Sequence, residues 1–299
     1  MSKLRTFLSV VWLFTFVAGK SQLITSPAPS VVYPRVGNAS YYDWLICRNP
    51  AYISCIDTRT NLPVWVSHAI TKELIEFGDT IKRVRPKDPS YSKDDRYKIL
   101  KNEAYNGSGY DHGHMAPAAD FKWSANVYKN SFLMTNMAPQ HGCLNQKGWC
   151  HLEALCREWA KEHTGLIVYI VTGVVPGTYI DTLCISKKLT VYVPEKFFKA
   201  ILLYDSIGME TKSIGFIMDN KDISITEVAD YMVTVDRIEE LTTLELFSFL
   251  PDDREEEIES ATGGFEIVIT TLDCPEKNCS SLYTGNRKLP EERTKLRCD

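Results

Sequence analysis

An apolar run from Leu166 to Val175 limits the fold of this chain more than any other segment. The run is rich in β-branched residues, which is typical of a strand buried at the centre of a sheet. Further strands are expected on the same grounds at residues 64–70, 132–137, 189–193, 198–203 and 213–218. The sequence therefore predicts a sheet as the core of the protein.

The spacing of apolar residues elsewhere predicts helices. The longest is expected from Asn145 to about His163, with Trp149, Leu152 and Trp159 on its apolar stripe. Two acidic helices are expected over residues 235–246 and 252–260. We therefore expect an α+β fold, with a central, mostly antiparallel sheet flanked by helices.

Both ends of the chain are expected to lie outside the folded domain. Lys3 and Arg5 precede an apolar run that ends in small residues near Gly19, the order of a secretory signal peptide. A membrane anchor is the alternative, although a span needs about 20 apolar residues and this run has about half that number. We predict a signal peptide at 1–19, a leader at 20–40, a domain at 41–262 and a cysteine-containing tail at 263–299. The protein would then be secreted, with no membrane association after cleavage.

The cysteines and sequons agree with a secretory route. In an oxidising compartment most of the nine cysteines should pair as disulfides, and their odd number leaves at least one outside such pairs. Asn38, Asn106 and Asn278 begin sequons for glycosylation. The net charge of −4 means that a nucleic-acid partner would have to be held by a local basic surface.

The strongest chemical signal lies between Asp111 and Asn145, a segment expected to fold as strand, loop, strand and helix. Hydrolysis of a phosphodiester needs a base for the water, a cation for the developing charge and a donor to the phosphate. His114 is a candidate base because neutral imidazole accepts a proton near physiological pH, and Asn136 could orient it through the other ring nitrogen. A hydrogen-bonded core histidine is the alternative for His114.

Three residues of the long predicted helix complete the candidate site. Asn145 either caps the helix with its side-chain oxygen or supplies that oxygen to Mg²⁺, a hard cation. Glu153 and Arg157 form either an exposed i,i+4 ion pair or part of a cleft. Since Asn145 precedes Glu153 by eight residues, about 80° around a helix, all three side chains could face one cleft.

Together these residues resemble the ββα-metal, DNA/RNA non-specific endonuclease family, which includes the mitochondrial endonuclease G type and the secreted Serratia type. The family signature is Asp-Arg-Gly-His, and Asp111, Gly113 and His114 match it. The family's strand asparagine, metal-binding asparagine and helical glutamate and arginine are matched by Asn136, Asn145, Glu153 and Arg157. The similarity extends over roughly residues 41–262.

The resemblance implies a ββα-metal catalytic motif and hydrolysis of DNA and RNA to products with 5′-phosphates. It makes His114 the general base and Asn145 the ligand of Mg²⁺, with Mn²⁺ as a substitute. Glu153 would be both a catalytic residue and a metal contact that orients the hydrated ion, and Arg157 would stabilise the phosphorane. Base sequence would not be read, because these groups contact only backbone oxygens. A homodimer, as many relatives form, and a monomer both stay open.

His112 departs from the family, which has arginine at this position. Histidine replaces a permanent cation with one that is charged only at lower pH, so His112 either gives a weaker or more acid-favouring catalyst or supports the loop. With Asp111 and Asn136 it completes the implied catalytic set. If the change abolished catalysis, the chain would be a nucleic-acid-binding protein on the same scaffold. A zinc site fits no standard spacing of the nearby residues His112, His114, His141, Cys143, Cys150 and His151.

Overall fold

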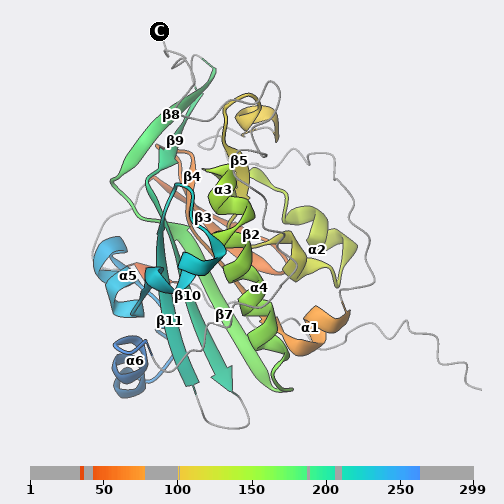
Figure 1. The fold of residues 1–299 in the computed structure, drawn as a ribbon, viewed down its shortest axis with the longest axis vertical. Coiled ribbons are helices and arrows are strands. Elements are labelled where there is room, and N and C mark those ends of the chain that lie inside the picture. The colour runs from red at the N-terminus through yellow and green to blue at the C-terminus, as the bar shows by residue number, and fades with distance from the viewer. Residues whose placement is uncertain are drawn as a thin grey trace, which may run out of the picture.

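The apolar run forms strand β7 (Leu166–Val174), which lies in the middle of a seven-stranded sheet in the computed structural model (Figure 1). The structure describes residues 34–36, 43–77, 100, 102–186, 189–205 and 211–262. The strand order is β12-β11-β10-β7-β4-β3-β2, and every neighbouring pair is antiparallel. The other strands are β2 (Trp44–Arg48), β3 (Tyr52–Asp57), β4 (Leu62–Thr71), β10 (Lys196–Asp205), β11 (Thr211–Asp219) and β12 (Met232–Val233). The predicted antiparallel core sheet is confirmed.

The sheet is covered on both faces. Successive side chains of a strand point to opposite faces, and in β4 Val66 belongs to one apolar core whereas Trp65 belongs to the other. Helix α4 (Gly148–Lys161) packs in the first core, and α5 (Val235–Thr242) and α6 (Asp252–Glu259) pack in the second. Figure 1 shows these helices on opposite sides of the sheet. Burial of both faces explains why the central strands are continuously apolar.

The segment with the chemical motif forms a hairpin followed by a helix. Its elements are β5 (Asp111–His114), β6 (Met137–Gln140) and α3 (Gly142–Gln146). The strand expected at 132–137 begins only at its last residue, because η4 (Met134–Asn136) is a 3-10 helix. The Asn136 N–H donates to the Leu133 carbonyl at 2.8 Å and closes this turn.

The single helix expected from residue 145 to residue 163 is two helices. Lys147 lies between α3 and α4 with φ −122° and ψ −97°, which is not a helical conformation. Asn145 and Glu153 are therefore on different helices. The expected angle of about 80° between them around one helix axis does not apply.

Short helices and strands connect the central sheet to the helices that pack on it. They are β1 (Arg35–Val36), α1 (Lys72–Phe77), η2 (Asn102–Tyr105), η3 (Ala118–Phe121), α2 (Ala125–Asn130), β8 (Tyr179–Ser186), β9 (Leu189–Pro194), η5 (Ile225–Tyr231) and β13 (Leu244–Glu245). β1 lies in the leader expected at 20–40 and pairs with β13. The two acidic helices are confirmed as α5 and α6. The predicted signal peptide at 1–19 and tail at 263–299 lie outside the described residues.

General pairing of the cysteines into disulfides is not supported. Cys47, Cys55 and Cys156 are buried thiols that are not part of a disulfide. Disulfide-bonded cysteines are Cys143, Cys150 and Cys184. Within the ranges that the structure describes, no helix is long and apolar enough to span a bilayer.

Gly173 marks the closest approach of β7 to its neighbours. A Cβ at this position would lie 2.1 Å from the Val64 carbonyl oxygen and 2.6 Å from the Phe198 ring. Because a backbone atom of the central sheet cannot move aside, we expect Gly173→Ala to lower the free energy of unfolding by about 3 kcal/mol, measured by chemical denaturation. Gly148→Ala is the matched control, since a Cβ there would lie 3.0 Å from an Ile223 methyl group and 3.1 Å from the Ile223 carbonyl oxygen, both farther than the 2.1 Å contact at Gly173. Equal losses in the two variants would contradict this account.

Candidate active site

The β5–β6 hairpin holds the motif residues in a fixed register. Asp111 lies opposite Gln140, and His114 lies opposite Met137. Gly113 has no room for a side chain, because a Cβ there would lie 2.4 Å from Oε1 and 2.6 Å from Cβ of the fully buried Gln140. Close packing inside the hairpin therefore requires the glycine of the motif.

Asp111 links the hairpin to α3. Its Oδ2 accepts hydrogen bonds from Asn145 Nδ2 at 3.0 Å and from Gln146 Nε2 at 2.7 Å. The N-cap of α3 is His141, whose Nδ1 accepts from the Cys143 N–H, so the capping alternative for Asn145 is wrong. Among the described residues, no donor is bonded to the Asn145 Oδ1. This amide oxygen is thus oriented by Asp111 and available to a cation.

Asn136 bonds to the backbone and not to an imidazole. Its Oδ1 accepts from the Ala116 N–H at 2.9 Å, and its Nδ2 donates to the carbonyls of Ala116 and Ser131, each at 2.8 Å. Within the part of the chain that is described, no side-chain bond of Asn136 reaches the His114 ring. The expected orientation of His114 through its other ring nitrogen is therefore not observed, and Asn136 instead fixes the loop that follows His114.

Both histidine rings of β5 pack against aromatic residues of neighbouring segments. The His114 ring lies 5.0 Å from the Phe132 ring at 86°, an edge-to-face contact. The His112 ring lies 4.8 Å from the ring of the buried Tyr105 at 33°. Both histidines are partly exposed as residues, although the Nε2 atom of His114 itself is buried. The contact with Tyr105 favours the loop-supporting alternative for His112.

The buried carboxylate of Asp120 joins α4 to the sheet. Its Oδ1 accepts from Arg157 Nη1 at 3.0 Å, and its Oδ2 lies 2.9 Å from His68 Nε2. Burial alone would raise the pKa of Asp120, but the bonds and charges of His68 and Arg157 outweigh burial and lower it. No ion pair joins Glu153 to Arg157 among the described residues, so the exposed-pair alternative for them is wrong.

Glu153 lies one turn before Arg157 in surroundings that disfavour its charge. Desolvation by burial raises the pKa of Glu153 to about 7, against the opposing effect of the positive charges of Lys199 and Arg157. A divalent cation beside this carboxyl would favour its charged form. Glu153 is therefore suited to become a carboxylate when an ion binds.

Three buried polar residues near the site were missed by sequence reasoning: His68, Asp120 and Lys199. Lys199 Nζ donates to Thr172 Oγ1 at 2.7 Å and lies 4.8 Å from the centre of the Trp149 ring. Burial lowers the pKa of Lys199. Lys199 could have been found from the sequence, because it is a charged residue inside the apolar run at 198–203 and a buried lysine needs polar partners.

The predicted residues thus form two bonded groups on the face of the sheet that α4 covers. The first joins Asp111 to Asn145, on the hairpin that also carries His112 and His114. The second joins Arg157 to Asp120, with Glu153 on the same helix. Hairpin and α4 contribute to the same apolar core. The two groups contain imidazole, amide, carboxyl and guanidinium side chains, which are kinds of group that phosphodiester hydrolysis uses.

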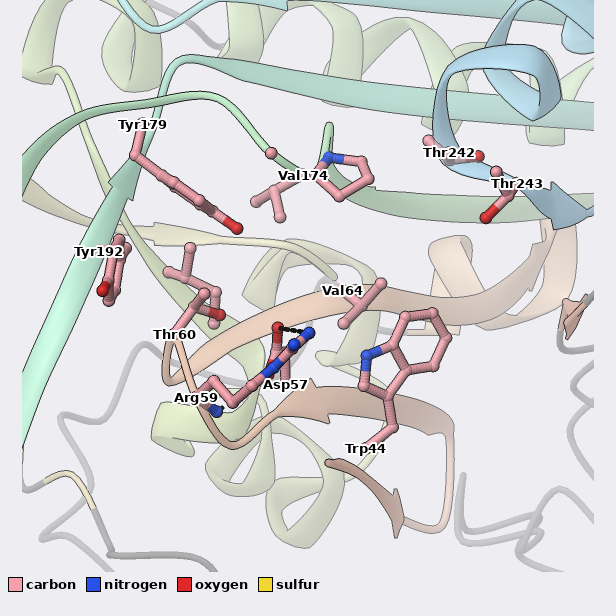
Figure 2. Close-up of a pocket in the computed structure, with 13 residues that line it drawn as sticks. Trp44, Asp57, Arg59, Thr60, Val64, Val174, Tyr179, Tyr192, Thr242 and Thr243 are labelled. Atoms are coloured by element: carbon pink, nitrogen blue, oxygen red, sulfur yellow. Dashed lines mark hydrogen bonds and ion pairs between the residues drawn. The ribbon is translucent and has the colours of Figure 1, made fainter. Parts of the chain in front are cut away.

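A separate cavity of about 380 Å³ opens between the β3–β4 turn, the start of β8 and the end of α5 (Figure 2). Trp44 and Tyr179 contribute aromatic walls. Arg59 pairs with Asp57 at 3.2 Å and with Asp43 at 3.4 Å, so its charge is already balanced. None of the predicted site residues lines this cavity. The cavity is therefore separate from the residues that the sequence predicts for hydrolysis.

Comparisons with known proteins identify the family of the chain. The sequence profile of the DNA/RNA non-specific endonuclease family matches residues 35–253. The chain is 32% identical over 219 residues to a mitochondrial nuclease of Saccharomyces cerevisiae, covering 67% of this chain and 64% of the relative. It is 30% identical over 205 residues to the mitochondrial endonuclease G of Homo sapiens, covering 65% and 66%. The chain thus spans slightly less than two thirds of the length of these relatives.

A solved structure is also similar. This solved structure is that of the EndoG/EndoGI complex and concerns the mechanism of EndoG inhibition. It matches this chain with a TM-score of 0.60 and 26% sequence identity, and the match covers 69% of this chain and 86% of the other. The matched relatives from Saccharomyces cerevisiae, Homo sapiens and Schizosaccharomyces pombe are named mitochondrial nucleases. The prediction of a secreted, extracellular protein is therefore wrong. The confirmed antiparallel sheet and the profile match over most of its length show that the chain belongs to the DNA/RNA non-specific endonuclease family.

Proposed function

We propose that the chain is a metal-dependent nuclease that hydrolyses phosphodiester bonds of DNA and RNA with little regard for base sequence. The observation that carries this proposal is the bond from Asn145 to Asp111, which sets an amide oxygen beside the strand that carries His114. The relatives named as endonuclease G and mitochondrial nuclease support the reaction class, and their names favour a mitochondrial localisation.

His114 is the proposed general base, which accepts the proton of the attacking water. The Asn145 Oδ1 would hold Mg²⁺, with Mn²⁺ as a substitute, because an amide oxygen is a hard ligand and Mg²⁺ needs few protein ligands. When bound, the ion would neutralise the charge that develops on the phosphate. Glu153 would accept hydrogen bonds from the waters of the hydrated ion and so orient it.

Arg157 would stabilise negative charge on the reacting phosphate. One of its nitrogens is bonded to Asp120, and the remaining N–H groups of the guanidinium are donors for phosphate oxygens. Asp111 and Asn136 are positioning residues, since they fix Asn145 and the loop after His114. All these groups act on phosphate oxygens, which accounts for weak dependence on base sequence and on the sugar.

Removal of the base or of the metal ligand should abolish hydrolysis. We expect His114→Ala and Asn145→Ala to lower the rate by about 10²–10⁴-fold on both plasmid DNA and RNA, because each removes a group that acts in the transition state. Gel assays with Mg²⁺ or with chelator measure this. His163→Ala, a change at an exposed histidine, is the matched control. Cutting by His114→Ala at the wild-type rate would overturn the base assignment, and an inert wild type would favour a nucleic-acid-binding protein.

His112 should set the pH dependence if its charge assists catalysis. A histidine is cationic only at lower pH, whereas arginine is cationic throughout. We therefore expect the pH–rate profile of His112→Arg to extend about one unit or more further to the alkaline side than that of the wild type. Superimposable profiles would show that His112 only supports the loop through its contact with Tyr105.

Glu153 should make stability depend on pH in the absence of metal. Its pKa rises from 4.5 to about 7 on folding, so the unfolded chain loses this proton at lower pH than the folded chain does. The wild type should therefore lose stability relative to Glu153→Gln as pH rises from about 4.5 to 7. Melting temperatures in chelator measure the difference. Glu158→Gln, on an exposed position of the same helix, is the control. A constant difference between wild type and Glu153→Gln across this range would refute the raised pKa.

A further inference from the structure

Three carboxylates meet on the face of the sheet opposite the candidate active site. Asp236 and Glu239 lie on α5, and Glu259 ends α6. One carboxylate oxygen from each lies within 4.8 Å of the others. Figure 1 shows α5 and α6 on the side of the sheet away from α4, so this acidic cluster is separate from the residues proposed for hydrolysis.

Glu259 is the unusual member of the acidic cluster. Only 3% of this residue is exposed, and its Oε1 has no hydrogen-bond partner among the described residues. A buried, unpaired carboxylate is costly, because desolvation is not compensated by a bond. Its surroundings must therefore supply either a proton or a cation.

The described residues supply little positive charge to the acidic cluster. The arginine of α5, Arg237, pairs with Glu240 at 2.6 Å, and the arginine of α6, Arg254, pairs with Glu257 at 3.6 Å. The further charged groups that act on the cluster or its neighbours are Arg35, Glu240, Glu245, Asp252, Glu255 and Glu256. All of them except Arg35 are acidic. Burial, followed by this mutual repulsion, raises the pKa of Glu259 to about 9.

We propose that Asp236, Glu239 and Glu259 bind a divalent cation, Ca²⁺ in preference to Mg²⁺, at a site distinct from the proposed catalytic ion. Carboxylate oxygens are hard ligands that suit both ions. Ca²⁺ binds oxygen at about 2.3–2.6 Å, so ligands on opposite sides of it are about 4.6–5.2 Å apart. For Mg²⁺, with about 2.1 Å, this separation is at most about 4.2 Å. Separations within 4.8 Å are compatible with either ion. The preference for Ca²⁺ comes from the number of carboxylates, because Mg²⁺ is usually bound through one or two carboxylates and keeps several waters, whereas Ca²⁺ accepts about six to eight oxygen ligands.

The ion would fasten the two C-terminal helices to each other and to the sheet. It would bridge α5 and α6, and the carbonyl of Ile258, next to Glu259, already accepts a hydrogen bond from Ser213 of β11 at 2.8 Å. Because the ion would bind the folded chain and not the unfolded chain, it would raise the melting temperature.

The test measures melting temperatures by calorimetry in chelator and with increasing Ca²⁺ or Mg²⁺. Wild type and Asn145→Ala, which lacks the proposed catalytic ligand, should both gain roughly 5–10 °C at a Ca²⁺ concentration about 100 times the Kd. Asp253→Asn, an exposed acid of α6, is the matched control and should gain the same. Glu259→Gln and Asp236→Asn should lose the gain. Since Asn145→Ala reports on this site alone, its outcome is independent of the nuclease proposal.

Two results would overturn the proposal. In the first, Ca²⁺ does not raise the melting temperature of the wild type, and Glu259→Gln is more stable than the wild type in chelator. Protons shared among the three carboxyl groups would then stabilise the cluster in place of an ion. The other is a Ca²⁺-dependent gain that Glu259→Gln retains. If Glu259→Gln does not fold, the half-exposed Asp236→Asn decides, because retention of the gain by that variant is equally contradictory.

Discussion

The carboxylate of Asp120 is the contact through which the sheet, the hairpin segment and helix α4 are held together. It follows the β5 strand in sequence, receives Arg157 from α4 and meets His68 of the central strand β4. All three groups are largely buried, and removal of any one would leave the others with uncompensated charge or polarity. The position of α4 relative to the hairpin is therefore set by charge pairing as well as by apolar packing. This arrangement fixes the positions of Glu153 and Arg157, the residues of the candidate site that lie on α4.

The two faces of the sheet carry different chemistry because alternate residues of the same strands serve different cores. On the α4 face, buried charges of both signs lie together, with Lys199 near Glu153 and Arg157 on Asp120. On the α5 and α6 face, the charges that meet are negative. On the first face Lys199 and Arg157 partly offset the acidic groups, whereas on the second a proton or a cation must do so.

Sequence periodicity predicted the central strands β4, β7, β10 and β11, because burial of both faces leaves a continuous apolar run, but it did not predict β2 or β3. It did not predict the break at Lys147. The Gly148 N–H donates to the Ile223 carbonyl at 3.2 Å, so a contact with a segment 75 residues away replaces the helical bond, and local sequence carries no trace of it. Asn136 was identified from the motif, yet its bonds to Ala116 and Ser131 depend on loop geometry. His68 and Lys199 interrupt apolar runs in the sequence, and this pattern could have indicated buried polar residues near the site.

Desolvation links the ionisation of the site to the binding of metal. Burial lowers the pKa of Lys199 and raises that of Glu153, so that each residue is more readily neutral than in water. A hydrated divalent ion held by Asn145 would bring positive charge that favours the Glu153 carboxylate, and the proton would be released as the ion binds. Metal affinity would then increase as pH rises through about 7, the pKa of Glu153. The raised pKa of Glu153 lets this carboxyl be neutral when no cation is near, while the Arg157–Asp120 bond anchors the helix that carries it.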